Sequence, residues 1–164
     1  MSTQVGDDVV WAFAESEHRD LGRGISRISE LTESLGQGRT PVPTARTREV
    51  LGWLHSILEP HFAWEEAALY PEVDARAGTP WATRAARLSH QQMRARIARL
   101  EAAWMPLPDQ ARRGRPTRAL VDLVALEALL RAHLELEEDV LFPVLTGSDV
   151  QPAARDAGES AKPE

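Results

Sequence analysis

The 164-residue sequence contains no cysteine. This absence excludes disulfides, thiolate zinc sites, iron–sulfur clusters and cysteine nucleophiles. The chain also lacks any uncharged apolar run approaching the roughly 18 residues that a membrane-spanning helix needs, and its first residues do not follow the pattern of a basic stretch before an apolar one. We therefore expect a cytoplasmic protein that has no membrane partner.

Basic residues are outnumbered by acidic ones. The 19 lysines and arginines against 25 aspartates and glutamates give a net charge of -6. This balance argues against nucleic acid as a partner, because nucleic-acid-binding surfaces are basic. The 43% apolar and 27% charged content is ordinary for a soluble globular protein, and the length corresponds to about one domain.

Glycine and proline cluster at residues 36–43, 78–80 and 106–116, which divides the chain into four long segments. These segments are residues 7–35, 44–77, 81–104 and 116–145. Each has apolar residues at alternating steps of three and four, the stripe of an amphipathic helix, and none alternates with period two for the length of a strand. The pattern predicts an all-α protein, an antiparallel up-down four-helix bundle.

The boundaries of these helices have local signals. Thr44 and Thr79 are expected N-caps. Pro71 and Pro143 are expected to kink or end their helices, and Pro60 to loosen the turn before His61, because proline lacks a backbone donor. The bundle is expected to occupy residues 1–146, and residues 147–164, which lose the apolar pattern, are expected to form a flexible tail.

A repeat picks out most of the histidines. At an offset of 72 residues, His18 aligns with His90, His61 with His133, and Glu65 with Glu137. The offset implies two helix hairpins related by a pseudo-twofold axis. The fifth histidine, His55, aligns with Glu127 instead and is expected to lie on the surface.

The repeated residues form a candidate metal site. Histidine and glutamate four positions apart project from one face of a helix, so each H-x-x-x-E supplies an imidazole and a carboxylate pointing the same way. Burying four imidazoles and two carboxylates with no metal would be costly. The predicted ligands are His18, His61, Glu65, His90, His133 and Glu137.

The mixed nitrogen and oxygen donor set fits two ions of iron or manganese, with zinc or copper less specific. His18 and His61 would hold one metal, His90 and His133 the other, and both glutamates would bridge. With a shared oxide, hydroxide or water, each metal has five bonds, which leaves an octahedral position open. The expected ligand is therefore small: dioxygen, nitric oxide or peroxide.

Residues 7–145 resemble the hemerythrin-like, or HHE cation-binding, domains. The resemblance rests on E-H-R-D-L at 17–21, H-x-x-x-E at 61–65, S-H-Q-Q-M at 89–93, and H-x-x-x-E at 133–137 with L-F-P following. It implies a four-helix bundle with a non-haem di-iron centre, in which the four repeated histidines are terminal ligands and the two repeated glutamates are bridges. The oxygen carriers of this family have a further histidine where this chain has Arg94, which argues against reversible oxygen carriage.

Such domains are associated with sensing oxygen or nitric oxide, handling peroxide, or holding iron. We therefore expect a di-iron protein that binds or senses a small ligand, with a redox enzyme (peroxide breakdown or iron oxidation) or an iron-holding protein as alternatives. The sequence names no protein partner. Glu66 and Glu138 lie five residues after a histidine, about 140° around the helix, and are expected to orient imidazole N–H groups and not to bridge metals.

Overall fold

The computed structural model describes residues 4–37, 44–104 and 115–147, and in these ranges it contains helices and no strand. The first helical segment is α1 (Gln4–Gly36). The second is a continuous run of α2 (Thr44–Trp53), η1 (Leu54–Leu58), α3 (Glu59–Trp64), η2 (Glu65–Leu69) and α4 (Tyr70–Ala77). The third is α5 (Arg84–Trp104), and the fourth is α6 (Arg115–Leu136), η4 (Glu137–Leu141) and α7 (Phe142–Thr146).

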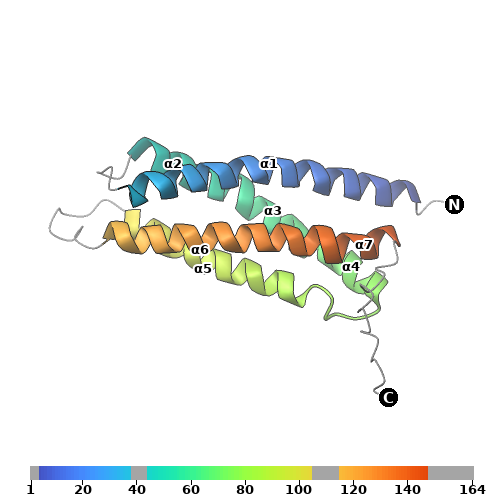
Figure 1. The fold of residues 1–164 in the computed structure, drawn as a ribbon. Helices are drawn as coiled ribbons and strands as arrows, with labels where there is room; N and C mark the ends of the chain where they lie inside the picture. The colour runs from blue at the N-terminus through green and yellow to red at the C-terminus, as the bar shows by residue number, and fades with distance from the viewer. Residues whose placement is uncertain (1–3, 38–43, 105–114, 148–164) are drawn as a thin grey trace, which may run out of the picture.

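The four segments run in alternating directions along a common axis (Figure 1). The closest packing is between α5 and α6 and between α1 and α6, while α4 packs against α7. The all-α, up-down four-helix bundle predicted from the sequence is therefore confirmed. Among the described residues, no helix has the length and apolarity that crossing a membrane would require. The predicted tail, residues 147–164, lies almost wholly outside the described residues.

Three prolines lie inside helical segments that continue through them. Pro60, Pro71 and Pro143 are the second residues of α3, α4 and α7, and each follows a five-residue π-helical stretch (η1, η2 or η4). The amide before each proline donates to the carbonyl five residues back, a wider turn than in an α-helix. Pro71 and Pro143 were expected to kink or end their helices, and the expectation that they end them is wrong, because the π turn accommodates the missing donor.

The loop between α4 and α5 is organised by Asp74. Gly78 ends α4 with a φ of 66°, a left-handed conformation that suits glycine, and its amide bonds to Ala75. The carboxylate of Asp74 accepts hydrogen bonds from the backbone amide and the hydroxyl of Thr83, both at 3.0 Å. Helix α5 therefore begins after Thr83, and the prediction of Thr79 as its N-cap is wrong.

Two apolar clusters fill the bundle on either side of a polar layer, which contains the repeated histidines and glutamates. The larger one contains buried residues from all four segments: Leu21, Ile25, Ile28, Leu31, Val50, Trp53, Leu54, Leu58, Phe62, Met93, Ile97, Leu100, Ala119, Leu123, Leu126 and Leu130. The smaller one contains Leu69, Tyr70, Val73, Ala86, Leu141, Phe142 and Leu145. In every segment the repeated histidines and glutamates fall next to or between these clusters, so burial of apolar surface on both sides fixes their positions.

Candidate metal centre

The six ligands predicted from the sequence lie together in the interior. They come from α1 (His18), α3 (His61), the first residue of η2 (Glu65), α5 (His90), α6 (His133) and the first residue of η4 (Glu137), and none is more than 6% exposed. Their donor atoms form two groups, each within 4.8 Å. One group contains His18 and His61, the other His90 and His133, and both glutamates belong to both groups. This is the division expected for two metal positions that share two carboxylates.

The inward contacts follow the pseudo-twofold repeat. His18 Nε2 lies 3.2 Å from Glu137 Oε2, and the equivalent His90 Nε2 lies 3.1 Å from Glu65 Oε2. His61 Nε2 lies 2.7 Å from Glu65 Oε1, whereas His133 Nε2 lies 3.6 Å from Glu137 Oε1. Every imidazole thus points its Nε2 atom inward, and each carboxylate directs one oxygen to each histidine pair.

The outward Nδ1 atoms contact acidic residues in three of the four cases. The Nδ1 atoms of His18 and His90 donate to Glu138 and Glu66 at 3.0 and 2.8 Å. The Nδ1 atom of His61 lies 3.7 Å from Glu17. An ionised carboxylate can only accept, so Glu138 and Glu66 fix the proton on Nδ1 and leave Nε2 as the donor atom for a metal.

Ser89 fixes the fourth imidazole by a different route. Its hydroxyl donates to the carbonyl of Ala86 at 2.7 Å, so its oxygen is left to accept from His133 Nδ1 at 2.9 Å. The Nε2 atom of His133 therefore carries a lone pair, as does that of His90, and the two atoms lie 3.1 Å apart. Two lone pairs facing each other at this distance repel unless a cation lies between them.

Glu65 and His61 are also incompletely satisfied. Among the described residues, no hydrogen bond of good geometry reaches either oxygen of Glu65 or either ring nitrogen of His61, although these atoms are buried. Burial raises the pKa of Glu65, but its contacts with His133, His61 and His90 outweigh burial and hold that pKa well below its usual range. An ionised, buried carboxylate with unused lone pairs can serve as a metal ligand, so the donor set fits a metal.

His18 has the opposite shift. Burial disfavours its imidazolium form, yet its hydrogen bonds with Glu137 and Glu138 outweigh burial and raise the pKa of His18. The excess negative charge of the surrounding carboxylates therefore attracts positive charge at this end of the centre. A metal cation would supply that charge.

Tyr70 also reaches the centre, although it is not among the residues predicted from the sequence. Its hydroxyl donates to Glu137 Oε1 at 2.6 Å and lies 3.0 Å from His90 Nε2. Burial, followed by the negative charges of Glu137 and Glu65, raises the pKa of Tyr70, so the phenol stays neutral. Its repeat partner Phe142 lies beside His18 with ring centroids 5.1 Å apart and has no hydroxyl.

Glu17 and Ser89 were missed as well. Each directly precedes a predicted ligand, and the 72-residue offset pairs them with each other, which is a signal that could have identified them. Arg94 lies outside the ligand set: its guanidinium donates to Glu66 at 2.7 Å and to Glu59 at 3.1 Å. His55 is exposed and contacts Glu101, away from the centre.

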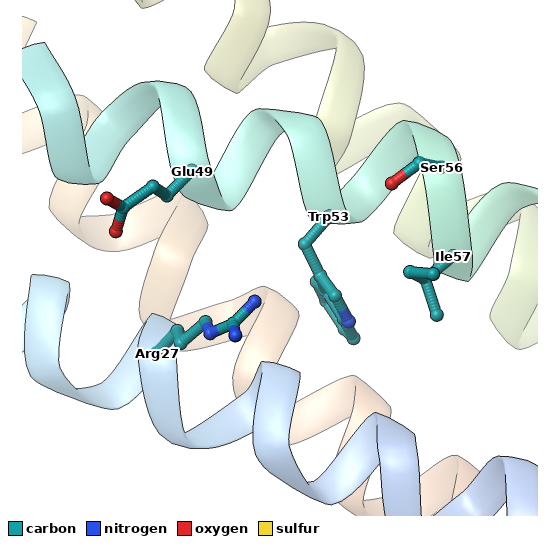
Figure 2. Close-up of a pocket in the computed structure, with 5 residues that line it drawn as sticks. All are labelled: Arg27, Glu49, Trp53, Ser56 and Ile57. Carbon is teal, nitrogen blue, oxygen red and sulfur yellow. The ribbon is translucent and has the colours of Figure 1, made fainter.

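A surface pocket of about 410 Å³ lies between α1 and the α2–η1 stretch and is separate from the buried centre (Figure 2). Its lining residues are Arg27, Glu49, Trp53, Ser56 and Ile57, and they include none of the six predicted ligands. The centre itself is enclosed by aromatic rings: Phe62 stacks on His90 with centroids 4.1 Å apart, and Trp64 lies 6.4 Å from His61.

Comparison with protein families gave a match over most of the chain. Residues 10–145 match the model of a family described as the hemerythrin HHE cation binding domain. Neither the curated proteins nor the solved structures contained a match to the chain. The matched range begins before His18 and ends at Leu145, so it includes most of the first and fourth helical segments, all of the second and third, and every residue of the centre described above.

Proposed function

Because this chain belongs to the hemerythrin HHE cation-binding domain family, we propose that it is a non-haem di-iron protein that binds or senses a small ligand such as dioxygen, nitric oxide or peroxide. The family binds metal cations, typically iron, and the described residues include two His/Glu groups able to hold a metal. We therefore propose that the metal is iron, that two ions bind each chain, and that their ligand is one of these small molecules.

One observation carries it most directly. His90 Nε2 and His133 Nε2 face each other at 3.1 Å while hydrogen bonds from their Nδ1 atoms leave both inward nitrogens as lone pairs. The unbonded oxygens of Glu65 lie against the same space. A metal cation satisfies all of these atoms together, whereas hydrogen bonds within the chain leave them opposed.

The proposed ligand set is His18 and His61 for one ion, His90 and His133 for the other, with Glu65 and Glu137 shared. Two imidazoles and two carboxylate oxygens per ion suit iron, and they suit manganese or zinc less selectively. When bound, iron would supply redox chemistry and coordination positions that the protein does not fill.

The chain's own residues restrict what reaches the centre. Phe62 and Phe142 lie against His90 and His18, and apolar clusters close both ends of the polar layer. This enclosure excludes bulk water and favours small, uncharged ligands. Arg94, at the position of the fifth histidine of the oxygen carriers, is turned toward Glu66 and Glu59, which supports sensing or binding over reversible oxygen carriage.

Metal content per chain, combined with the visible spectrum, tests the proposal. Protein loaded anaerobically with ferrous iron and freed of excess should retain two irons per chain, and its spectrum should change on exposure to air or nitric oxide. Chains in which Glu65 or Glu137 is replaced by alanine should retain fewer irons. Protein that retains no transition metal after loading would refute the proposal, and sustained turnover of peroxide or ferrous iron would favour the enzyme alternative.

A further inference from the structure

The two proposed metal positions differ in the groups behind their ligands. We define the first position as the one formed by His18 and His61, and the second as the one formed by His90 and His133, with the two glutamates shared. The pseudo-twofold repeat pairs every residue of one position with a residue of the other, 72 residues apart. Each departure from the repeat is therefore a difference between two otherwise equivalent sites.

The outward acceptors differ first. At the first position the outward groups are two carboxylates: Glu138 accepts from His18 Nδ1 at 3.0 Å, and Glu17 lies 3.7 Å from His61 Nδ1, beyond hydrogen-bond distance. At the second position they are Glu66, which Arg94 contacts at 2.7 Å, and the neutral hydroxyl of Ser89. A carboxylate behind an imidazole strengthens the opposite nitrogen as a metal donor. Two carboxylate charges therefore lie behind the imidazoles of the first position, whereas the second has one carboxylate paired with Arg94, so the charge favours stronger imidazole donors at the first position.

The shared carboxylates differ next. Tyr70 donates a 2.6 Å hydrogen bond to Glu137 Oε1, which is the oxygen that faces His133 of the second position. A hydrogen bond withdraws charge from the oxygen that accepts it, so this oxygen is a weaker metal donor. The phenol oxygen also lies 3.0 Å from His90 Nε2 and crowds the second position, whereas Phe142 places no polar group beside His18.

From the carboxylate charge behind the first position and the Tyr70 hydrogen bond at the second, we infer that the two positions bind metal unequally: His18 and His61 hold the first ion tightly, and His90 and His133 hold the second more weakly. The inference rests on the proposed function, since it requires a two-metal centre. It makes the singly loaded chain a defined species with its ion at the first position, and it makes the second position the one that exchanges or loses its ion when metal is scarce.

The experiment is an anaerobic titration of the full chain with ferrous iron, in which native mass spectrometry counts the ions on each molecule. Two equal, independent positions would leave about half of the chains singly loaded at one equivalent of iron. We expect the singly loaded species to predominate, with the two binding steps separated by about tenfold or more. A statistical mixture, or a direct passage from no iron to two, would overturn the inference and leave the two-metal proposal standing. Failure to bind any iron would overturn both.

Matched variants assign the difference to its causes. Tyr70→Phe gives the second position the ring that Phe142 gives the first, and it should bring the two steps closer together. Glu138→Gln and Glu66→Gln are equivalent under the repeat: the first should weaken the tight step by about tenfold, and the second should affect only the weak step. A Glu66→Gln effect on the tight step would contradict the assignment. Helical circular dichroism of each metal-free variant establishes that it is folded.

Discussion

The first half of this bundle contains the first two helical segments, and the second half contains the last two. The two halves share their polar centre and differ in the contacts that hold their helices together. In the first half, Gly24 of α1 lies against the indole of Trp53, so closely that a Cβ atom at Gly24 would come within 1.9 Å of the ring. In the second half, the residue at the equivalent register is Arg96, which with Arg99 contacts the buried Asp122 at 2.8 and 3.0 Å. The difference teaches that the repeat constrains the donor atoms of the centre, whereas the scaffold can be held by packing in one half and by charge in the other.

The largest expected effect comes from removing equivalent ligands, one from each half. His61→Ala and His133→Ala should each lose most of the stabilisation that iron provides, which for the intact chain is about 4 kcal/mol at an iron concentration 1,000 times the dissociation constant. His61→Ala should lose more of the iron-dependent stabilisation than His133→Ala, because His61 belongs to the metal position that we infer to be tighter. The measurement is chemical unfolding with and without ferrous iron under anaerobic conditions.

The control is His55→Ala, which removes an exposed imidazole outside the centre and should keep the full iron-dependent stabilisation. Equal responses in His55→Ala and His61→Ala would mean that iron acts on the surface of the protein and not at the centre. A larger loss in His133→Ala than in His61→Ala would reverse the order of the two positions.

The polar centre was the part of the structure most readable from the sequence. Spacing of four along a helix places His61 and Glu65 on one face, and the 72-residue offset supplied the other half of the set. Glu66 and Glu138 could be assigned to the outward nitrogens because five residues correspond to about 140° around a helix. These inferences depend on local geometry, which the amino-acid order determines directly.

Features that depend on contacts between distant segments could not be predicted. The hydroxyl of Tyr70 bonds to Glu137, 67 residues away, and no spacing rule joins these positions. The π turns before Pro71 and Pro143 let the helical segments continue where the sequence predicted that they could end. Helix α5 begins at Arg84, and not at about Trp81 as the sequence predicted, because the amide and hydroxyl of Thr83 donate hydrogen bonds to Asp74.

The contact between Gly24 and Trp53 in the first half should give the next largest effect on the free energy of unfolding. Gly24→Ala should destabilise the protein by up to about 3 kcal/mol, because the added methyl group overlaps the Trp53 indole and both lie in a packed interface. Gly22→Ala is the matched control, since nothing lies within 4 Å of a Cβ atom there. It should stabilise α1 by about 0.5–1 kcal/mol, as alanine favours helix over glycine. Urea unfolding of the metal-free proteins measures both, and a stabilised Gly24→Ala would show that Trp53 moves aside freely.

The ion pairs of Asp122 with Arg96 and Arg99 in the second half should have a smaller effect on stability, and one that depends on pH. Burial raises the pKa of Asp122, but Arg96 and Arg99 outweigh burial and hold it below its usual value. A carboxylate with a lowered folded pKa contributes stability that is present above its unfolded pKa, about 3.9, and that is lost as the pH falls through the folded pKa. Asp122→Asn should therefore cost about 2 kcal/mol at neutral pH, and the difference from the unmodified chain should shrink as the pH falls below 4.

Urea unfolding of both proteins at a series of pH values between 7 and the acid limit of folding provides the test, and the first half again supplies the control. Gly24→Ala carries no charge change, so its destabilisation should stay constant over the same range. A cost of Asp122→Asn that is equally constant with pH would indicate that the carboxylate acts through shape alone and not through its charge.

The smallest effect is expected at Thr83, where the two halves are joined. Its hydroxyl donates to Asp74 at 3.0 Å and accepts from Arg87 at 3.0 Å, and its side chain is fully buried at the start of α5. Thr83→Ala should cost about 1 kcal/mol, the usual net contribution of a side-chain hydrogen bond. Thr79→Ala should cost less than about 0.5 kcal/mol, because Thr79 is only half-buried and caps no helix in the described part of the chain. The same urea measurements compare them, and the reverse order would restore Thr79 as the residue that starts the second half.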